Sequence, residues 1–148
     1  MRPTVEQTML AVAATLARRG TCPRRKVGCV LTDEMNRILA TGYNGVPPGQ
    51  PHCSLENPCP GAGQPPGQGL NFCEASHAES NAIAFCPDIT RVAKVFCTAS
   101  PCVACVKLLL LTPARDLYFV EEYPHELARD WWVRAGRSWR RVIIGAAL

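Results

Sequence analysis

Hydrophobic and polar positions change their spacing several times along the chain, and each spacing predicts a different element. The first apolar positions recur every three or four residues, which predicts an amphipathic helix over residues 4–19 that ends before Gly20. Two apolar runs follow, at 26–32 and 37–43, and the polar turn between them predicts a β-hairpin. The helical spacing is carried by Val5, Met9, Val12 and Leu16.

The second half of the chain alternates between helical patterns and short apolar runs. The predicted helices cover 77–85, 102–111 and 125–136, and the predicted strands cover 92–98, 115–120 and 138–144. Alternation of this kind predicts an α/β fold with helices on both faces of a sheet. We expect a three-layer α/β/α sandwich with a central five-stranded mixed sheet, in which the hairpin is followed by parallel strands.

The bulk composition narrows the class of protein. The 148 residues, of which 47% are hydrophobic, fit one globular domain over 1–148, and no apolar run is long enough to span a bilayer. A net charge of +4 suits an anionic ligand such as a nucleotide without requiring a nucleic acid. The apolar stretch MLAVAATLA resembles the core of a signal peptide. Because Glu6 precedes it and Arg18 and Arg19 follow it, a docked helix is the better interpretation.

A segment rich in Pro, Gly and Cys, residues 44–73, interrupts the regular pattern. A loop of about thirty residues costs entropy to order, so we expect it either to be a mobile insertion or to be stapled in place. The chain has nine cysteines, an odd number that suits metal binding or chemistry in a reducing cytosol better than a disulfide framework. Cys29, Cys86 and Cys97 lie in apolar runs, where we expect core residues.

Four residues in the second half have the types and spacing of a catalytic zinc site. His77 opens one predicted helix with Glu79 two positions later, and Cys102 and Cys105 open the next helix, behind the favourable cap Ser100 and Pro101. Thiols at a helix start have a lowered pKa, which favours the metal-binding thiolate.

Each half of this pattern has an alternative explanation when it is taken alone. Ser76 and Glu79 fit a capping box, and a Cys-x-x-Cys pair also occurs in redox proteins. The combination of His-x-Glu and Pro-Cys-x-x-Cys at successive helix starts, with a strand between them, is the pattern of zinc-dependent deaminases.

These residues carry a family resemblance. HAESNAIAF and SPCVAC resemble the cytidine deaminase superfamily, and residues 22–53, CPRRKVGCVLTDEMNRILATGYNGVPPGQPHC, resemble the deoxycytidylate (dCMP) deaminases of bacteria and phages. The resemblance covers about residues 4–123. It implies the cytidine deaminase-like fold and the hydrolytic deamination of dCMP to dUMP and ammonia in a bacterial or phage-infected cytosol. His77, Cys102 and Cys105 would bind the catalytic zinc.

The resemblance also implies roles for individual residues. Glu79 would be the catalytic carboxylate, moving a proton from water to ring N3 and then toward the departing ammonia. Asn44 would contact the sugar, although an Asn-Gly turn also explains it, and the Ala78 backbone would meet the base carbonyl. The 5′-phosphate would lie near Tyr123 and the basic residues that precede the first strand, for which a solvated edge is the alternative. These basic residues are Arg24 and Lys26, with Arg25 between them.

A second, structural zinc and allosteric control are further implications of the resemblance. The second zinc would be bound by Cys22, Cys53, Cys59 and Cys73, with His52 competing for the place of Cys59; reduced, unused thiols are the alternative. The GYNG loop, with Gly42, Tyr43 and Gly45, would bind dCTP as activator or dTTP as inhibitor. We expect a homo-oligomer, a hexamer or a dimer, and neither a membrane nor a nucleic acid as partner.

Three rival functions stay open at this point. The substrate could be a 5-methyl or 5-hydroxymethyl dCMP, or dCTP. A tRNA or single-stranded DNA deaminase would need a basic, aromatic channel, and tryptophans and arginines do cluster near the C-terminus, although tryptophans packed on the sheet explain that cluster better. A zinc protein without catalysis would not need Glu79. The clustered residues are Trp131, Trp132, Trp139, Arg134, Arg137, Arg140 and Arg141.

Overall fold

A computed structural model describes residues 1–65, 68–69 and 73–145 of the chain. The predicted order of helices and strands is confirmed, and a short 3-10 helix, η2, is added to it. None of the described helices combines the length and the apolar character needed to cross a membrane. The elements are α1 (Val5–Ala17), β1 (Gly28–Thr32), β2 (Ile38–Tyr43), α2 (Ala78–Ala84), η2 (Ile89–Arg91), β3 (Lys94–Ala99), α3 (Val103–Leu109), β4 (Asp116–Glu121), α4 (Glu126–Arg134) and β5 (Ser138–Arg141).

The sheet has five strands in the order β2-β1-β3-β4-β5. β1 pairs antiparallel with both β2 and β3, whereas β3, β4 and β5 run parallel to one another. The predicted mixed sheet, with a hairpin followed by parallel strands, is therefore confirmed. Parallel neighbours bring their carboxyl ends to one edge of the sheet, which is where functional groups gather in α/β folds.

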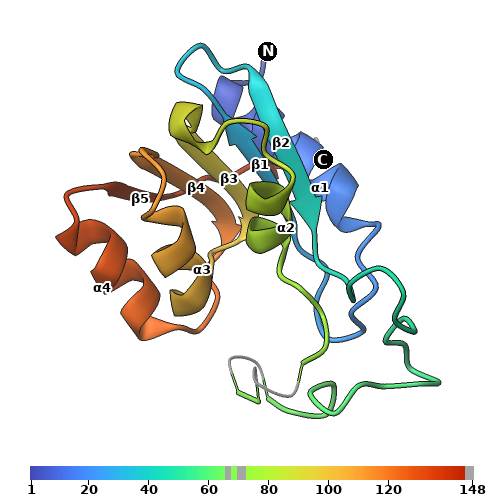
Figure 1. Ribbon diagram of the computed structural model, residues 1–148. Helices are drawn as coiled ribbons and strands as arrows, with labels where there is room; N and C mark the ends of the chain where they lie inside the picture. The colour runs from blue at the N-terminus through green and yellow to red at the C-terminus, as the bar shows by residue number, and fades with distance from the viewer. Residues whose placement is uncertain (66–67, 70–72, 146–148) are drawn as a thin grey trace.

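Helices cover both faces of the sheet and complete the predicted three-layer sandwich (Figure 1). α1 lies on one face, where Leu10 and Ala13 pack against the inner side chains of β1, β3 and β4. α2, α3 and α4 lie on the other face, over a larger core that contains Trp132, Phe119 and Leu117. Cys29 and Cys97 are fully buried in this core, as expected, and Cys86 packs at its margin.

The buried face of α1 differs from the one that apolar spacing predicted. Thr4 and Gln7 form a capping box at the helix start. The fully packed residues are Leu10, Ala13 and Ala17, and Val5 is exposed. The cause is close backbone packing: a Cβ atom on Gly28 of β1 would lie only 1.9 Å from the Ala13 carbonyl oxygen. Small residues on both elements let them approach, so the larger Met9, Val12 and Leu16 flank the contact.

A second close approach fixes the position of α2 against the sheet. A Cβ atom on Gly42 of β2 would lie 2.2 Å from the Ala78 carbonyl oxygen and 2.6 Å from the Ala82 nitrogen. Only glycine lets the first turn of α2 reach β2 at this distance. Asn81 of α2 strengthens the contact, because its side-chain nitrogen donates to the Tyr43 carbonyl at 2.8 Å.

The insertion predicted over residues 44–73 leaves the domain and returns to it at one place. Gly45 and Ser76 form an isolated antiparallel bridge, in which the Gly45 nitrogen donates to the Ser76 carbonyl at 3.1 Å and the Ser76 nitrogen donates to the Gly45 carbonyl at 2.8 Å. Residues 66–67 and 70–72 of the insertion lie outside the described residues.

Candidate active site

A cavity of about 370 Å³ opens at the edge of the sheet where β3 and β4 end. The start of α2 lines it, together with the segment before β1, the loop between β3 and α3, and the end of β4. His77, Glu79 and Cys102 all face this cavity. The sequence pattern therefore predicted correctly that residues from two helix starts meet at one place.

Three of the predicted metal ligands lie within contact distance of one another. The His77 Nδ1 atom is 3.5 Å from the Cys102 sulfur and 3.3 Å from the Cys105 sulfur. Among the described residues, this is the one set of three or more His, Cys, Asp or Glu whose ligand atoms all lie within 4.8 Å of one another. His77 is the N-cap of α2 and Cys102 is the N-cap of α3, so each helix start supplies a donor.

The start of α3 differs in detail from the prediction. Ser100 and Pro101 were expected as the N-cap and the first helical residue, but Cys102 is the cap and the helix begins at Val103. The Ser100 hydroxyl has another partner, because its oxygen accepts from the Tyr123 backbone nitrogen at 2.7 Å. This contact joins the loop before α3 to the segment after β4.

Contacts within the cluster shift the pKa values of Cys102, Cys105 and His77 in different directions. The hydrogen bond from the Cys105 thiol, and the His77 imidazole beside it, lower the pKa of Cys102. The same hydrogen bond and burial raise the pKa of Cys105. The bond to Cys102 raises the pKa of His77 against the effect of its burial. The lowered pKa of Cys102 favours its thiolate, which is the form that binds a metal.

The donor set fits zinc in both chemistry and spacing. Zinc prefers Cys sulfur and His nitrogen, and bonds of about 2.0–2.3 Å in a tetrahedron keep the donors about 3.5 Å apart. The separations from the His77 Nδ1 atom to the two sulfurs, 3.5 and 3.3 Å, match that spacing. Three protein donors beside an open cavity leave a coordination position for a small ligand.

Glu79 lies beside this donor set and is almost completely buried, with 4% of its surface exposed. Burial raises the pKa of its carboxyl, which is opposed by a hydrogen bond from its own backbone nitrogen and by the positive charge of His77. The capping-box alternative is wrong, because His77 rather than Ser76 is the N-cap of α2 and no side chain caps that end. A buried carboxylate next to three metal donors is suited to proton transfer.

The residues predicted to contact substrate have different surroundings. Ala78 and Tyr123 line the cavity, and so does Asn44. The Asn44 amide is held by backbone, because its oxygen accepts from Val27 N at 2.8 Å and its nitrogen donates to Arg25 O at 2.7 Å. Asn44 thereby positions the basic segment that precedes β1.

The three consecutive basic residues separate in space. Arg24 and Arg25 line the main cavity, whereas Lys26 lines a smaller neighbouring hollow. Glu121, at the end of β4, was missed by the sequence argument although it lines both cavities. A signal was available, since acidic residues directly follow the apolar strand YFV at the functional edge of the sheet.

The cysteines predicted to bind a second zinc lie around the insertion. Cys22, Cys53 and Cys59 are buried, and Cys73 is half-buried. The Cys59 backbone nitrogen donates to the Cys53 sulfur at 3.2 Å. Burial would raise the pKa of the Cys59 thiol, but hydrogen bonds from the Glu74 backbone and from Cys53 lower it. His52, the competing ligand, is exposed.

The C-terminal tryptophans pack as structural residues. Trp132 is fully buried and donates from its indole nitrogen to the Ser138 carbonyl at 2.7 Å. Trp131 has Lys107 and Arg134 over its ring, with the charged groups 4.8 and 5.0 Å from the centroid. The interpretation of the cluster as tryptophans packed on the sheet is confirmed for Trp132.

Comparison with known proteins identifies the family. The model of the cytidine and deoxycytidylate deaminase zinc-binding region matches residues 3–121. The deoxycytidylate deaminase of Mycobacterium phage D29 is 34% identical over 129 residues, covering 82% of this chain and 98% of the phage protein. The deoxycytidylate deaminase of Saccharomyces cerevisiae is 31% identical over 125 residues, covering 83% of this chain; the chain spans 39% of the length of that yeast protein.

A solved structure agrees with these sequence relationships. The dCMP deaminase of cyanophage S-TIM5, determined in complex with dCMP and dUMP, has a TM-score of 0.75 and 25% identity to this chain, over 96% of this chain and 99% of that one. The fold and the family resemblance expected from the sequence are both confirmed. With a family model over most of its length and a phage relative matched almost throughout, the chain belongs to the cytidine and deoxycytidylate deaminases, a family of zinc-binding enzymes.

Proposed function

We propose that the protein catalyses the hydrolytic deamination of dCMP to dUMP and ammonia. The observation that carries this proposal is the buried Glu79 carboxylate beside His77, Cys102 and Cys105 on the cavity at the carboxyl edge of the sheet. Similarity to deaminases named for deoxycytidylate, and to a phage enzyme solved with dCMP and dUMP, supports dCMP as the substrate.

In this proposal His77, Cys102 and Cys105 hold the catalytic zinc, which supplies Lewis-acid activation of water when bound. Glu79 does the proton chemistry. Its carboxylate takes one proton from the attacking water and delivers it to ring N3. It then takes the second proton of that oxygen, from the hydroxyl now on C4, and delivers it to the amino group, which leaves as ammonia while the C4 carbonyl forms. Burial raises the pKa of Glu79, which makes its carboxylate a better proton acceptor for a group that must both accept and release a proton.

The walls of the cavity would orient the nucleotide. The Ala78 backbone, at the start of α2, is our candidate for the base carbonyl, because backbone nitrogens in the first turn of a helix have no partner within the helix. Asn44 is our candidate for the sugar, and Tyr123 lines the cavity beside Arg25. A cavity of about 370 Å³ has the size of a small-ligand site.

We also propose a second, structural zinc held by Cys22, Cys53, Cys59 and Cys73. Burial of the first three and the nitrogen-to-sulfur hydrogen bond between Cys59 and Cys53 support it, because such bonds stabilise a thiolate. A closed zinc site would supply the staple that a long insertion needs. Two zinc equivalents per chain in elemental analysis are the expected result, and one equivalent would contradict this part of the proposal.

Control by dCTP and dTTP and assembly into a homo-oligomer remain proposals that rest on the family resemblance. The GYNG loop has a scaffold role whether or not it also binds an effector. Gly42 lets α2 approach the sheet, Gly45 bridges to Ser76, and the Tyr43 carbonyl accepts a hydrogen bond from Asn81. Activity measured with and without each triphosphate would test the regulatory part.

The experiment that tests the main proposal is ammonia release from dCMP by the zinc-loaded protein, followed by the loss of cytosine absorbance. We expect conversion of dCMP to dUMP, with slower or no conversion of dCTP, deoxycytidine and single-stranded DNA. The 5-methyl and 5-hydroxymethyl forms of dCMP belong in the same panel. Turnover of a polynucleotide in preference to dCMP, or zinc binding without turnover of any substrate in the presence of dCTP, would overturn the proposal.

A further inference from the structure

The connection from β3 to α3 is short. β3 ends at Ala99, and α3 begins at Val103 with Cys102 as its N-cap, so only residues 100–102 separate the strand from the helix. A connection of this length has little slack. The point at which the chain leaves the sheet therefore decides where the Cys102 sulfur lies relative to His77, whose Nδ1 atom is 3.5 Å away.

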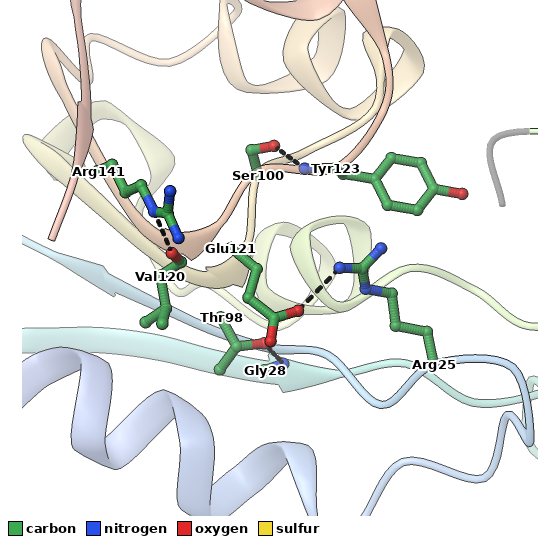
Figure 2. A network of polar contacts seen from close by, with 8 residues as sticks. All are labelled: Arg25, Gly28, Thr98, Ser100, Val120, Glu121, Tyr123 and Arg141. Carbon is green, nitrogen blue, oxygen red and sulfur yellow. Dashed lines mark hydrogen bonds and ion pairs between the residues drawn. The ribbon is translucent and has the colours of Figure 1, made fainter. Parts of the chain in front are cut away.

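The pairing of β3 with β4 changes its character at Ser100. Ala99 pairs with Glu121, and the Ser100 nitrogen donates to the Glu121 carbonyl at 2.9 Å. In a regular parallel ladder, the Tyr123 nitrogen would donate next to the Ser100 carbonyl. It donates instead to the Ser100 hydroxyl oxygen, at 2.7 Å (Figure 2). The side chain of Ser100 thus takes the place of its own carbonyl as the ladder acceptor.

A hydroxyl matters at this position because the contact is buried. Ser100 is 4% exposed, so the Tyr123 N–H needs an acceptor from the protein. Pro101 follows and has no backbone N–H, so the turn adds no further donor. The hydroxyl satisfies the Tyr123 nitrogen while the main chain already bends toward α3. With alanine at position 100, that nitrogen is paired only if the ladder continues to the carbonyl, which keeps the chain in the sheet for one more step.

The strand on the other side of β3 ends in the same way. Cys29 of β1 pairs with Cys97, so Gly28 lies opposite Thr98. The Gly28 nitrogen donates to the Thr98 hydroxyl oxygen at 3.1 Å (Figure 2). Hydroxyls at positions 98 and 100 therefore hold the backbone of β1 on one side and the segment after β4 on the other. Side chains, rather than the ladder itself, fix the end of β3 against both neighbours.

The Ser100 contact also joins two walls of the catalytic cavity. Ser100, Cys102 and Tyr123 all line this cavity. Cys102 belongs to the wall with the metal donors, and Tyr123 belongs to the wall formed by the segment after β4. Because the oxygen that holds the Tyr123 backbone belongs to a residue just before Cys102, it sets the separation of these walls. A shift of about 1 Å in such a site can cost about 100-fold in rate.

We propose that Ser100 is a positioning residue, which holds Cys102 and Tyr123 at the separation that the reaction requires. It acts through these two residues rather than through chemistry of its own hydroxyl. The inference rests on the proposed function, since the reaction depends on Ser100 through the zinc donor Cys102. The hydroxyl, and not the size of the side chain, has this role, so threonine can replace serine whereas alanine cannot.

The visible spectrum of the cobalt-loaded protein tests the metal side of the proposal. Co²⁺ takes the place of zinc, and its d–d and thiolate-to-metal charge-transfer bands depend on the geometry of the donors. We would compare Ser100→Ala with Ser100→Thr, which keeps the hydroxyl, and with Ser138→Ala as the control. Ser138→Ala removes a hydroxyl bond of 2.6 Å to Asp116, where β4 and β5 begin, at the opposite ends of the strands from the cavity.

Ser100→Ala should shift the cobalt bands and lower kcat for dCMP by about 10- to 100-fold. Ser100→Thr should restore both, and Ser138→Ala should lower the thermal midpoint without changing either. Wild-type bands and kcat in Ser100→Ala, or an equal loss in Ser100→Thr, would overturn the proposal. Circular dichroism verifies that each variant is folded.

The two readouts separate this inference from the proposed function. If the cobalt bands shift in Ser100→Ala although the wild-type protein does not deaminate dCMP, the proposed reaction fails and the positioning of Cys102 stands. If the wild-type protein deaminates dCMP and Ser100→Ala matches it in bands and kcat, the reaction stands and the role of Ser100 fails.

Discussion

The close approach of α2 to the sheet leads to a prediction about zinc binding. Replacing Gly42 by Ala puts a methyl group 2.2 Å from the Ala78 carbonyl oxygen, whereas ordinary van der Waals contact begins at 3.4 Å. The start of α2 must therefore retreat by about 1.2 Å. The methyl group is bonded directly to the backbone of β2, and the atoms that it meets, the Ala78 oxygen and the Ala82 nitrogen, belong to the backbone of α2, so no side-chain rotation can relieve the clash.

The displacement moves one half of the proposed zinc site and leaves the other half in place. His77 and Glu79 move with α2, while Cys102 and Cys105 stay with α3. Metal sites accept changes of about 0.2 Å in ligand distances, so a shift of this size should weaken zinc binding by at least about 100-fold. The overpacked contact should also cost about 1–3 kcal/mol of stability.

The assay is zinc affinity, measured by competition with a chromophoric chelator, together with the thermal midpoint. Gly28→Ala is the matched control, because the new methyl group would lie 1.9 Å from the Ala13 carbonyl oxygen, but on the opposite face of the sheet. Gly28→Ala should lose at least as much stability as Gly42→Ala. Its folded form should nevertheless bind zinc with wild-type affinity. Unchanged zinc affinity in Gly42→Ala, or an equal loss in both variants, would refute the reasoning.

Three further outcomes follow from other contacts. Glu79→Gln should retain zinc, measured by elemental analysis, and lose about 100- to 10,000-fold in kcat, since only the proton carrier is removed. Arg137→Met should cost about 2–3 kcal/mol in urea unfolding, because the guanidinium donates to three carbonyls at the end of α3 and in the turn after it. The backbone nitrogen of Arg37 lowers the pKa of Asp33, with further help from Met35 and Arg91. The Asp33 carboxylate therefore stabilises the fold at neutral pH, and this contribution is lost as pH falls below 3.8, the ordinary pKa of an aspartate, so Asp33→Asn should flatten the acid limb of a stability curve.

The sequence was sufficient for the parts of the structure that local pattern determines. The spacing of hydrophobic positions and the turn residues predicted the order of helices and strands and the mixed sheet. The spacings of His77 with Glu79 and of Cys102 with Cys105 predicted that these residues gather at one site. These features depend on residues close together in the chain, or on a topology with few alternatives.

The differences lie where distant residues decide the outcome. Ser100 is a good N-cap by type, yet its hydroxyl binds the backbone of Tyr123, which comes from another strand end. Arg24 and Arg25 are identical residues in adjacent positions, but one binds the insertion and the other binds Glu121. Local sequence propensity does not distinguish these partners, because each contact joins residues that are distant in the sequence and is decided by the tertiary fold.

The bridge between Gly45 and Ser76 has a consequence for how this domain can vary. Because the insertion begins and ends at the same pair of hydrogen bonds, its closure is already enforced by the domain. For a flexible loop, each doubling of length then costs only about 0.6 kcal/mol. Additional residues placed between Gln50 and Pro51, in the exposed part of this segment, should leave the sheet and the start of α2 undisturbed. The insertion is thus the place where such a chain can gain or lose length, or accept a fused module, while the chemistry at its base stays the same.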